Sequence, residues 1–224
     1  MPDNTSPAAE DYLKALWHLA AGRGVSDGVV STTALAERLD VSAASATNML
    51  KRLDGMGLVG YVPYRGGSLT DAGRKVALEV IRHHRLLETY LSEALGVPWD
   101  QVHDEAEILE HVLSEGLEDR IASHLGDPTV DPHGHPIPTK DGAMPSISGR
   151  SLWTVEHGEH AAVDRVPDDQ PEALRWLDSI GLRPGVKVEI TGRGPVEGPL
   201  FVRVDGTGEP HAFSRTLAES IWVL

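Results

Sequence analysis

The sequence predicts a mostly α-helical protein with a β-rich C-terminal part. Three observations support this fold class: two short helices with clear N-cap signals follow each other after residue 31, helical periodicity continues through a long segment after residue 70, and strand-like segments dominate after residue 151. We therefore expect a winged helix-turn-helix over residues 1–75, a helical part over residues 76–145 and a small β-barrel over residues 151–224.

The composition is that of an ordinary globular protein. The 224 residues are 40% hydrophobic and 24% charged, enough for a real core in one or two domains. The longest apolar runs are too short for a membrane span, and the N-terminus lacks the pattern of a secretory signal. The chain has no cysteine, which excludes disulfides, thiolate zinc sites and cysteine nucleophiles. We expect a cytoplasmic protein with no membrane partner.

The first 75 residues predict three helices and a hairpin. Residues 8–22 have apolar side chains at helical spacing. One of Ser31, Thr32 and Thr33 caps a helix that ends near residue 40, and Ser42 caps a second helix that stops at Gly55 or Gly57. Segments 58–63 and 68–70 then flank the turn Tyr64-Arg65-Gly66-Gly67, which predicts the wing.

The rest of the chain divides into helices, a linker and strands. A helix of nearly 26 residues begins at Thr70 or Asp71 and ends before Gly96, and another extends from residue 99 or 100 to 125. Residues 126–150 contain five prolines and form a linker or an extended wrap. Strands are expected within 155–166, 187–193, 199–206 and 219–224, with one short helix at 171–180.

The second helix of the helix-turn-helix resembles a DNA-reading surface more than a protein-binding one. A helix that enters a major groove needs short side chains, an amide for base edges and basic groups for phosphates. This helix offers Ser42, Ala44, Ser45, Thr47, Asn48, Lys51 and Arg52, and the wing adds Arg65. The formal charge of −14 disfavours nucleic acid, but residues 31–75 carry a balance of +2, so the acidity lies elsewhere.

Histidines and carboxylates share one helical face after residue 102. At 100° per residue, His103, Glu107, Glu110 and His111 fall within an arc of about 100°, and the larger apolar side chains take the other side. A solvated acidic face is the alternative. His84 and Glu88 also share a face, and Asp11 on the first helix could complete a site. Oxygen and imidazole ligands without cysteine suit Mn(II) and Fe(II), while Zn(II), Co(II) or Ni(II) could substitute in vitro.

The order of these motifs resembles the diphtheria toxin repressor family of metal-dependent transcriptional regulators. The resemblance rests on the winged helix followed by HHRLLETYL, VHDEAEILEH and DPHGHPIP, and it covers essentially the whole chain. It implies a homodimer, formed by the helical domain, that binds double-stranded operator DNA, either singly or as two dimers per operator. It also implies repression of metal-uptake genes when metal is bound.

The resemblance assigns roles residue by residue. It implies a primary metal site of Asp11, Glu107, Glu110 and His111 and a second site of His84, Glu88 and His103. It implies that the operator is read by Thr33, Ser42, Ala44, Ser45 and Asn48, with Arg65 on the wing; we add Arg52 as a phosphate contact.

Two departures from the family pattern concern the metal. Iron-type members have Met and Cys where this chain has Asp11 and Glu107, and the two carboxylates predict Mn(II), with an iron-responsive regulator as the alternative. Two-domain manganese regulators carry Glu where this chain has Lys14, which argues against their binuclear site. His103 matches the second site of three-domain members, and Asp168, Gln170 and Glu172 are the candidates for a further ligand from the barrel.

Two functions from other classes compete with this one. A metallohydrolase could use the same carboxylate and histidine face, but it would need a general base and an open coordination position, and HDEAE lacks the HExxH spacing. A winged-helix regulator without metal, whose barrel binds a protein, would leave Glu107, Glu110 and His111 unexplained. We therefore expect no catalytic residues.

Overall fold

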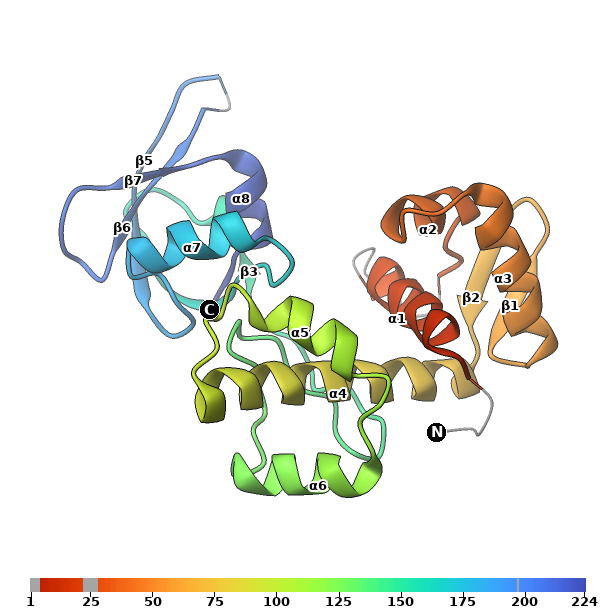
Figure 1. Ribbon diagram of the computed structural model, residues 1–224. Helices are drawn as coiled ribbons and strands as arrows, with labels where there is room; N and C mark the ends of the chain where they lie inside the picture. The colour runs from red at the N-terminus through yellow and green to blue at the C-terminus, as the bar shows by residue number, and fades with distance from the viewer. Residues whose placement is uncertain (1–4, 22–27, 197) are drawn as a thin grey trace. The chain divides into compact units, whose positions relative to one another are not determined.

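The computed structural model describes residues 5–21, 28–196 and 198–224 (Figure 1). The chain folds into two compact units, and each is treated by itself. The first unit contains the described part of residues 1–83 together with 110–113 and 138–144; the second contains 84–109, 114–137 and 145–224. Within the described ranges, no helix combines the length and the apolar character that a membrane span requires.

The winged helix-turn-helix forms as expected. Helices α1 (Pro7–Ala21), α2 (Thr32–Arg38) and α3 (Ala43–Gly55) enclose an apolar core. The Ser31 hydroxyl accepts a hydrogen bond from the Ala34 amide, and the Ser42 hydroxyl accepts one from the Ser45 amide. Both N-caps are confirmed, with Ser31 as the capping residue among the three candidates. Residue 22, the expected end of the first helix, lies outside the described residues.

The wing is the antiparallel hairpin of β1 (Val59–Val62) and β2 (Gly66–Leu69). Its second strand begins two residues earlier than expected, because the strand also bridges to the segment before α2: the Gly67 amide donates to the Val30 carbonyl at 3.0 Å, and the Val30 amide donates to the Gly67 carbonyl at 2.8 Å. Gly66 has φ +120°, and a Cβ there would lie 1.9 Å from the Val30 carbonyl oxygen. Only glycine fits this junction.

The long helix is confirmed as α4 (Asp71–Leu95). The single helix expected over residues 99–125 is wrong: α5 (Val102–Leu109) ends before Glu110, and α6 (Glu115–His124) starts after its N-cap Ser114. The break has a tertiary cause, because the Glu110 carboxylate is fully buried against Lys14 and the His83 ring contacts the Glu110 carbonyl at 3.2 Å.

The C-terminal part forms an open sheet and not the expected closed barrel. Its six antiparallel strands have the order β3-β8-β4-β5-β6-β7, and no pairing among the described residues joins β3 to β7. The strands and their associated helices are β3 (Arg150–Ser151), the 3-10 turn η1 (Leu152–Thr154), β4 (His160–Arg165), α7 (Pro171–Ser179), β5 (Lys187–Arg193), β6 (Leu200–Val204), β7 (His211–Phe213), α8 (Arg215–Ser220) and β8 (Trp222–Val223). Leu174, Leu177 and Phe213 belong to its apolar core, which Trp99 also joins.

Candidate metal clusters and DNA-binding surface

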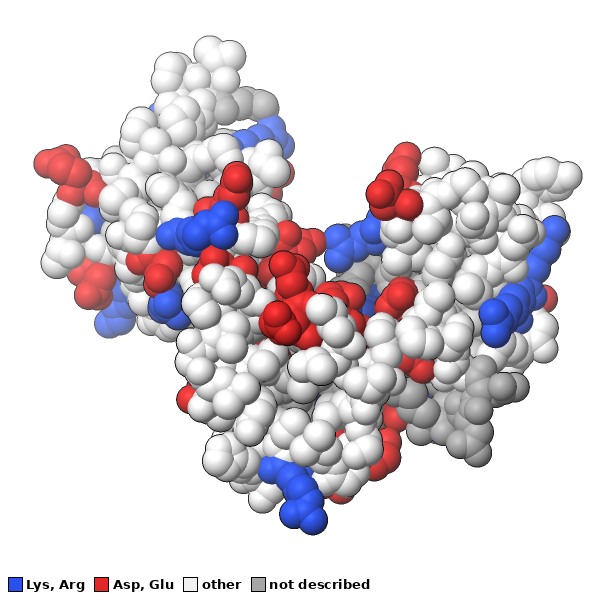
Figure 2. All heavy atoms as spheres, viewed as in Figure 1, with Lys and Arg blue, Asp and Glu red and all other residues white. Residues whose placement is uncertain are grey.

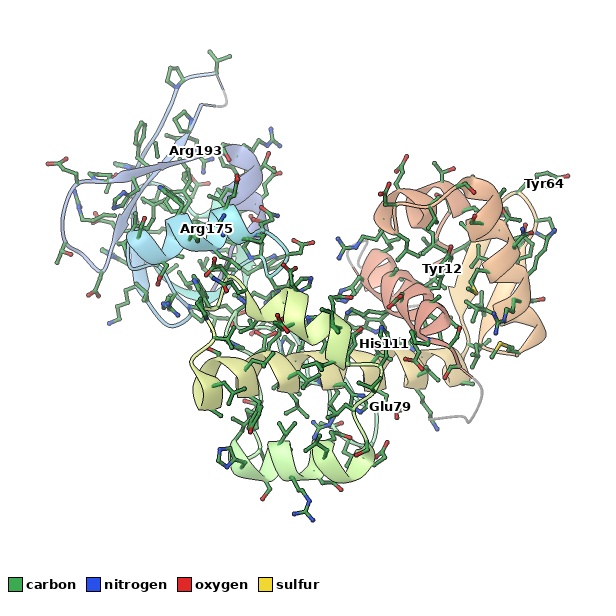
Figure 3. All side chains as sticks on the ribbon, viewed as in Figure 1. Tyr12, Tyr64, Glu79, His111, Arg175 and Arg193 are labelled. Carbon is green, nitrogen blue, oxygen red and sulfur yellow. The ribbon has the colours of Figure 1, made fainter. Side chains whose placement is uncertain are left out.

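The first unit brings together Asp11, Glu110 and His111, which we call the first cluster. Asp11 lies on α1, and Glu110 and His111 lie in the turn after α5; His111 is labelled in Figure 3. His111 Nε2 is 3.0 Å from Asp11 Oδ1 and 3.6 Å from Glu110 Oε1. One ligand atom from each residue lies within 4.8 Å of the others, a spacing that a single ion can bridge.

Two further α1 residues contact the first cluster. The buried carboxylate of Glu10 lies 2.7 Å from His111 Nδ1, so it orients the ring and leaves Nε2 toward Asp11. The Lys14 ammonium lies 2.9 Å from both carboxylate oxygens of Glu110. Hydrogen bonding to Asp11, helped by Glu10 and Glu110, raises the pKa of His111 to about 9 against the opposing effect of burial.

Glu107 belongs to the second unit, unlike its expected partners Asp11, Glu110 and His111. Its Oε1 lies 3.8 Å from His103 Nε2 and 4.0 Å from His84 Nδ1. The structure thus places Glu107 beside residues expected in the second site, and its role at the first cluster stays a prediction.

The second unit brings the expected second-site residues together. His84 Nε2 lies 3.0 Å from Glu88 Oε1 and 3.2 Å from His103 Nδ1. His103 Nδ1 also lies 3.4 Å from the same Glu88 oxygen. His84 and Glu88 are almost completely buried.

The other oxygen of Glu88 faces residues that we had not expected as ligands. Glu88 Oε2 lies 3.8 Å from Nδ1 of His133, and Glu88, Asp131 and His133 form another group of closely spaced ligand atoms. We call His84, Glu88, His103, Asp131 and His133 the second cluster. His133 is fully buried: its Nε2 contacts the Trp99 carbonyl at 2.8 Å, and its ring stacks on Trp99 with centroids 5.6 Å apart.

The proline-rich segment that carries His133 and His135 forms a turn around Asp131. Asp131 Oδ1 accepts hydrogen bonds from the backbone amides of His133 and His135, so it does hold a turn. The same turn directs the His133 ring into the interior.

Orphaned buried atoms in the second cluster fit a cation. Glu88 Oε2, Asp131 Oδ2 and His133 Nδ1 are buried without a hydrogen-bond partner among the described residues. Burial opposes charge on Glu88, yet His84, His103 and His133 hold its pKa well below the ordinary value. Burial likewise opposes charge on His133, but the Glu88 carboxylate raises the pKa of His133 to about 9. Anionic oxygen and imidazole nitrogen at this spacing are suitable ligands for a divalent metal.

Of the three candidates from the C-terminal part, Asp168 lies next to this region. Its Oδ2 is 3.5 Å from His135 Nδ1, whereas Gln170 and Glu172 are exposed at the start of α7. Burial would raise the pKa of Asp168, but His135, with contributions from His103 and His133, lowers it to about 2.

The expected DNA-reading residues lie on the surface of the winged helix. Their side chains are exposed on α2, on α3 and its N-cap, and on the wing, at Thr33, Ser42, Ala44, Ser45, Asn48, Arg52 and Arg65. Ser42 also serves as the N-cap of α3, so its hydroxyl already accepts one hydrogen bond. Figure 2 shows Lys and Arg atoms over α3 and the hairpin.

A groove of about 460 Å³, which we call the wing groove, lies between α2, α3 and the hairpin. Its lining includes Thr33, Thr47, Lys51 and Arg65. Tyr64 also lines it, at the tip of the wing, with φ 65° and a fully exposed side chain (Figure 3). Hydroxyl and cationic groups around such a groove suit a phosphate backbone. The sequence predicted Tyr64 only as a residue of the turn in the wing.

Three family models match the chain in order. They are described as the iron dependent repressor N-terminal DNA binding domain, over residues 4–67, the iron dependent repressor metal binding and dimerisation domain, over 70–139, and the FeoA domain, over 150–224. The FeoA match accounts for the part with the open sheet. The models describe binding and dimerisation domains, which favours a regulator over the hydrolase alternative.

Individual relatives agree with these models. The iron-dependent repressor IdeR of Mycobacterium bovis is 39% identical over 130 residues, which are 58% of this chain and 54% of the relative, so that match spans about half the relative's length. The IdeR of Mycobacterium leprae is 38% identical over 195 residues, covering 81% of this chain and 82% of the relative.

The solved structures include one of a manganese-dependent transcriptional repressor in complex with manganese. It is 41% identical to this chain, with a TM-score of 0.87, and the match covers 96% of this chain and 99% of that one. Together with the matched domains and the M. leprae relative, this similarity identifies the family. The chain belongs to the iron-dependent repressor family, the diphtheria toxin repressor family of metal-dependent transcriptional regulators.

Proposed function

We propose that this chain is a Mn(II)-responsive transcriptional repressor. The observation that carries the proposal is the first cluster, in which Asp11 on the first helix of the winged-helix part meets Glu110 and His111 from a turn about 100 residues later. A metal held by all three ligands ties the DNA-binding part to that turn. Metal loading and operator binding thereby become linked, because the ion favours the arrangement that brings its ligands together.

Mn(II) is the proposed metal because all candidate ligands are carboxylate oxygens or imidazole nitrogens, and the chain has no cysteine. Fe(II) is the second candidate, favoured by relatives that are named iron-dependent repressors. The same ligands accept Zn(II), Co(II) or Ni(II) in vitro, since the affinity order of divalent metals overrides ligand preference there.

We assign one metal to each cluster. Asp11, Glu110 and His111 hold the first, with Glu107 as a further ligand. For the second, Glu88 and His133 are the central ligands, completed by His84 and His103 on one side and Asp131 on the other, with Asp168 acting on this region through His135. Orphaned atoms on Glu88, Asp131 and His133 support this second assignment.

The proposed partner is double-stranded operator DNA, bound by a homodimer in the cytoplasm, with two dimers on one operator. Repression of metal-uptake genes follows the pattern of the family. Coupling between two binding sites is commonly 1–3 kcal/mol, so metal should tighten operator binding about 5- to 150-fold.

Metal titration of the chelator-treated protein tests the metal part of this proposal. Calorimetry under anaerobic conditions should give two Mn(II) ions per chain, and Asp11→Asn and Glu88→Gln should each remove a different one. Operator fragments obtained by selection from random DNA should bind about 5- to 150-fold more tightly with metal, and Asp11→Asn should abolish that dependence. DNA binding that is indifferent to metal would contradict the linkage, and loss of neither ion in the two variants would contradict the ligand assignment.

The DNA-binding surface is tested by two substitutions with different expected signatures. Asn48→Ala should cost about 1–3 kcal/mol and relax preference at one base pair, because an amide reads base edges. Arg65→Ala should weaken binding to all sequences alike and reduce the salt slope by about one, because a phosphate contact is lost. Competition with mutated operators at several salt concentrations separates the two. Equal loss of specificity in both variants would contradict these roles.

A further inference from the structure

Lys14 lies in an unusual position for a cation beside a candidate metal site. It is three residues after Asp11 on α1, so both side chains lie on neighbouring positions of one helical face. Its ammonium is 2.9 Å from Oε1 and 2.9 Å from Oε2 of Glu110. Glu110 is fully buried and the Lys14 side chain is 12% exposed, so the pair is largely shielded from solvent.

A buried carboxylate requires a compensating charge, and Lys14 supplies one to Glu110. A divalent ion at the first cluster would supply another to the same group. Since the ammonium engages both oxygens, the ion must either displace it or share the carboxylate with it. Two cations that share one carboxylate repel each other strongly in a poorly solvated site.

We propose that Lys14 is a tethered competitor for the metal at the first cluster and sets the Mn(II) concentration at which this cluster fills. This inference rests on the proposed function, in which Asp11, Glu110 and His111 hold the metal. Lys14 is attached to the same helix as Asp11, so it is present at constant effective concentration, whatever the metal supply. It keeps Glu110 neutralised when metal is scarce and raises the concentration of metal needed to replace it.

The test uses full-length protein in a Glu88→Gln background, so that only the first cluster is titrated. Lys14→Met removes the charge and keeps the length of the side chain, and Lys14→Arg keeps the charge as a matched control. At fixed pH and salt, Lys14→Met should bind Mn(II) at least about tenfold more tightly than the parent. Lys14→Arg should stay within about threefold, because the charge is retained.

Thermal unfolding gives a readout that does not depend on DNA binding. Without metal, Lys14→Met should unfold at a lower temperature than the parent, because Glu110 loses its partner. Mn(II) should raise its unfolding temperature by more than it raises that of the parent. Lys14→Gln serves as a second neutral variant if Lys14→Met does not fold. Unchanged or weaker Mn(II) binding in the neutral variants would overturn the inference, and weaker binding would make Lys14 a residue that positions Glu110.

Adding Asp11→Asn to the Glu88→Gln parent distinguishes failure of the proposed first metal site from failure of the role given to Lys14. If Asp11→Asn leaves Mn(II) binding unaltered, the proposed first site fails and this inference fails with it. If Asp11→Asn weakens binding but neutral Lys14 variants do not strengthen it, only the role of Lys14 is wrong.

Discussion

His111 is held by carboxylates on both sides of its ring. Glu10 contacts Nδ1 and Asp11 contacts Nε2, and both acidic residues come from α1. An imidazole whose second nitrogen is fixed by a carboxylate is a better oriented and more basic metal ligand. In this arrangement Glu10 positions His111, while Asp11 and His111 are the groups proposed to share the ion. Consecutive residues of one helix therefore have different roles.

The protonation of His111 should make the metal-free protein lose stability at alkaline pH. The folded pKa of about 9 is above the ordinary value of 6.5, so the stabilisation is fully present below pH 6.5 and disappears as the pH rises through 9. Unfolding of chelator-treated protein, followed at several pH values, should show a decline across this window. Because His133 titrates in the same range, the comparison is with His111→Gln, whose decline should be smaller by on the order of 1–2 kcal/mol. Identical pH dependence in both proteins would contradict the ion-pair geometry.

At the scale of single residues, the sequence grouped His84, Glu88 and His103, which the structure brings together, but it did not reveal which side chains are buried. His84, Glu88 and His103 could be grouped because helical spacing brings the first two to one face and a metal needs such donors. His133 could not, because its inward orientation depends on Asp131 and on stacking with Trp99, and both are tertiary features. The sequence showed Lys14 only as a residue that replaces the Glu of two-domain manganese regulators. Its contact with Glu110 could not be predicted, because the two residues are 96 positions apart.

Local signals predicted the elements of the winged helix well. Ser31 and Ser42 each cap a short helix, and such hydrogen bonds are encoded within four residues. The break between α5 and α6 was missed because His103, Glu107, Glu110 and His111 fit one continuous helical face. Burial of Glu110 against Lys14 overrides that periodicity. As a result, Glu110 and His111, two of the three proposed ligands of the first cluster, lie in a turn and not on a helix.

The position of the wing is set by its backbone hydrogen bonds to Val30, in the segment before α2. Gly66→Ala should displace the hairpin, because its Cβ would lie 1.9 Å from the Val30 carbonyl oxygen. DNA affinity should fall at least about tenfold, while Mn(II) stoichiometry stays at two per chain. Gly60→Ala is the matched control, since its Cβ would meet only Ser68, at ordinary distances of 3.7 Å from Oγ and 4.0 Å from the carbonyl oxygen. Equal DNA affinities for the two variants would show that the junction does not position the wing.

Across the whole molecule, acidity and DNA binding are compatible because the charges are segregated. The formal charge is −14, yet residues 31–75 have a balance of +2. Acidic atoms gather over α5, where Asp104 and Glu105 are exposed (Figure 2). Net charge alone disfavours a nucleic-acid partner. The uneven distribution of charge is compatible with a nucleic-acid partner, and the match to a DNA-binding domain over residues 4–67 includes most of the segment with positive balance.

The C-terminal part should influence the second cluster through Asp168. Asp168→Asn removes the negative charge 3.5 Å from His135, so we expect Mn(II) affinity at the second cluster to fall about tenfold. The measurement is calorimetry in an Asp11→Asn background, where only the second cluster binds. Glu172→Gln is the control, because this carboxylate is exposed, and it should leave the affinity unchanged. A similar affinity in both variants would mean that the C-terminal part does not act on this site.

The stacking of Trp99 on His133 also makes the protein's own fluorescence informative. Trp99 is almost fully buried, and its indole lies nearly parallel to an imidazole of the second cluster, at an interplanar angle of 20°. A paramagnetic ion such as Mn(II) held by that imidazole quenches a neighbouring excited indole, whereas diamagnetic Zn(II) does not. Binding of Mn(II) at the proposed second site should therefore be visible optically, without a label, as the loss of emission from one tryptophan among five.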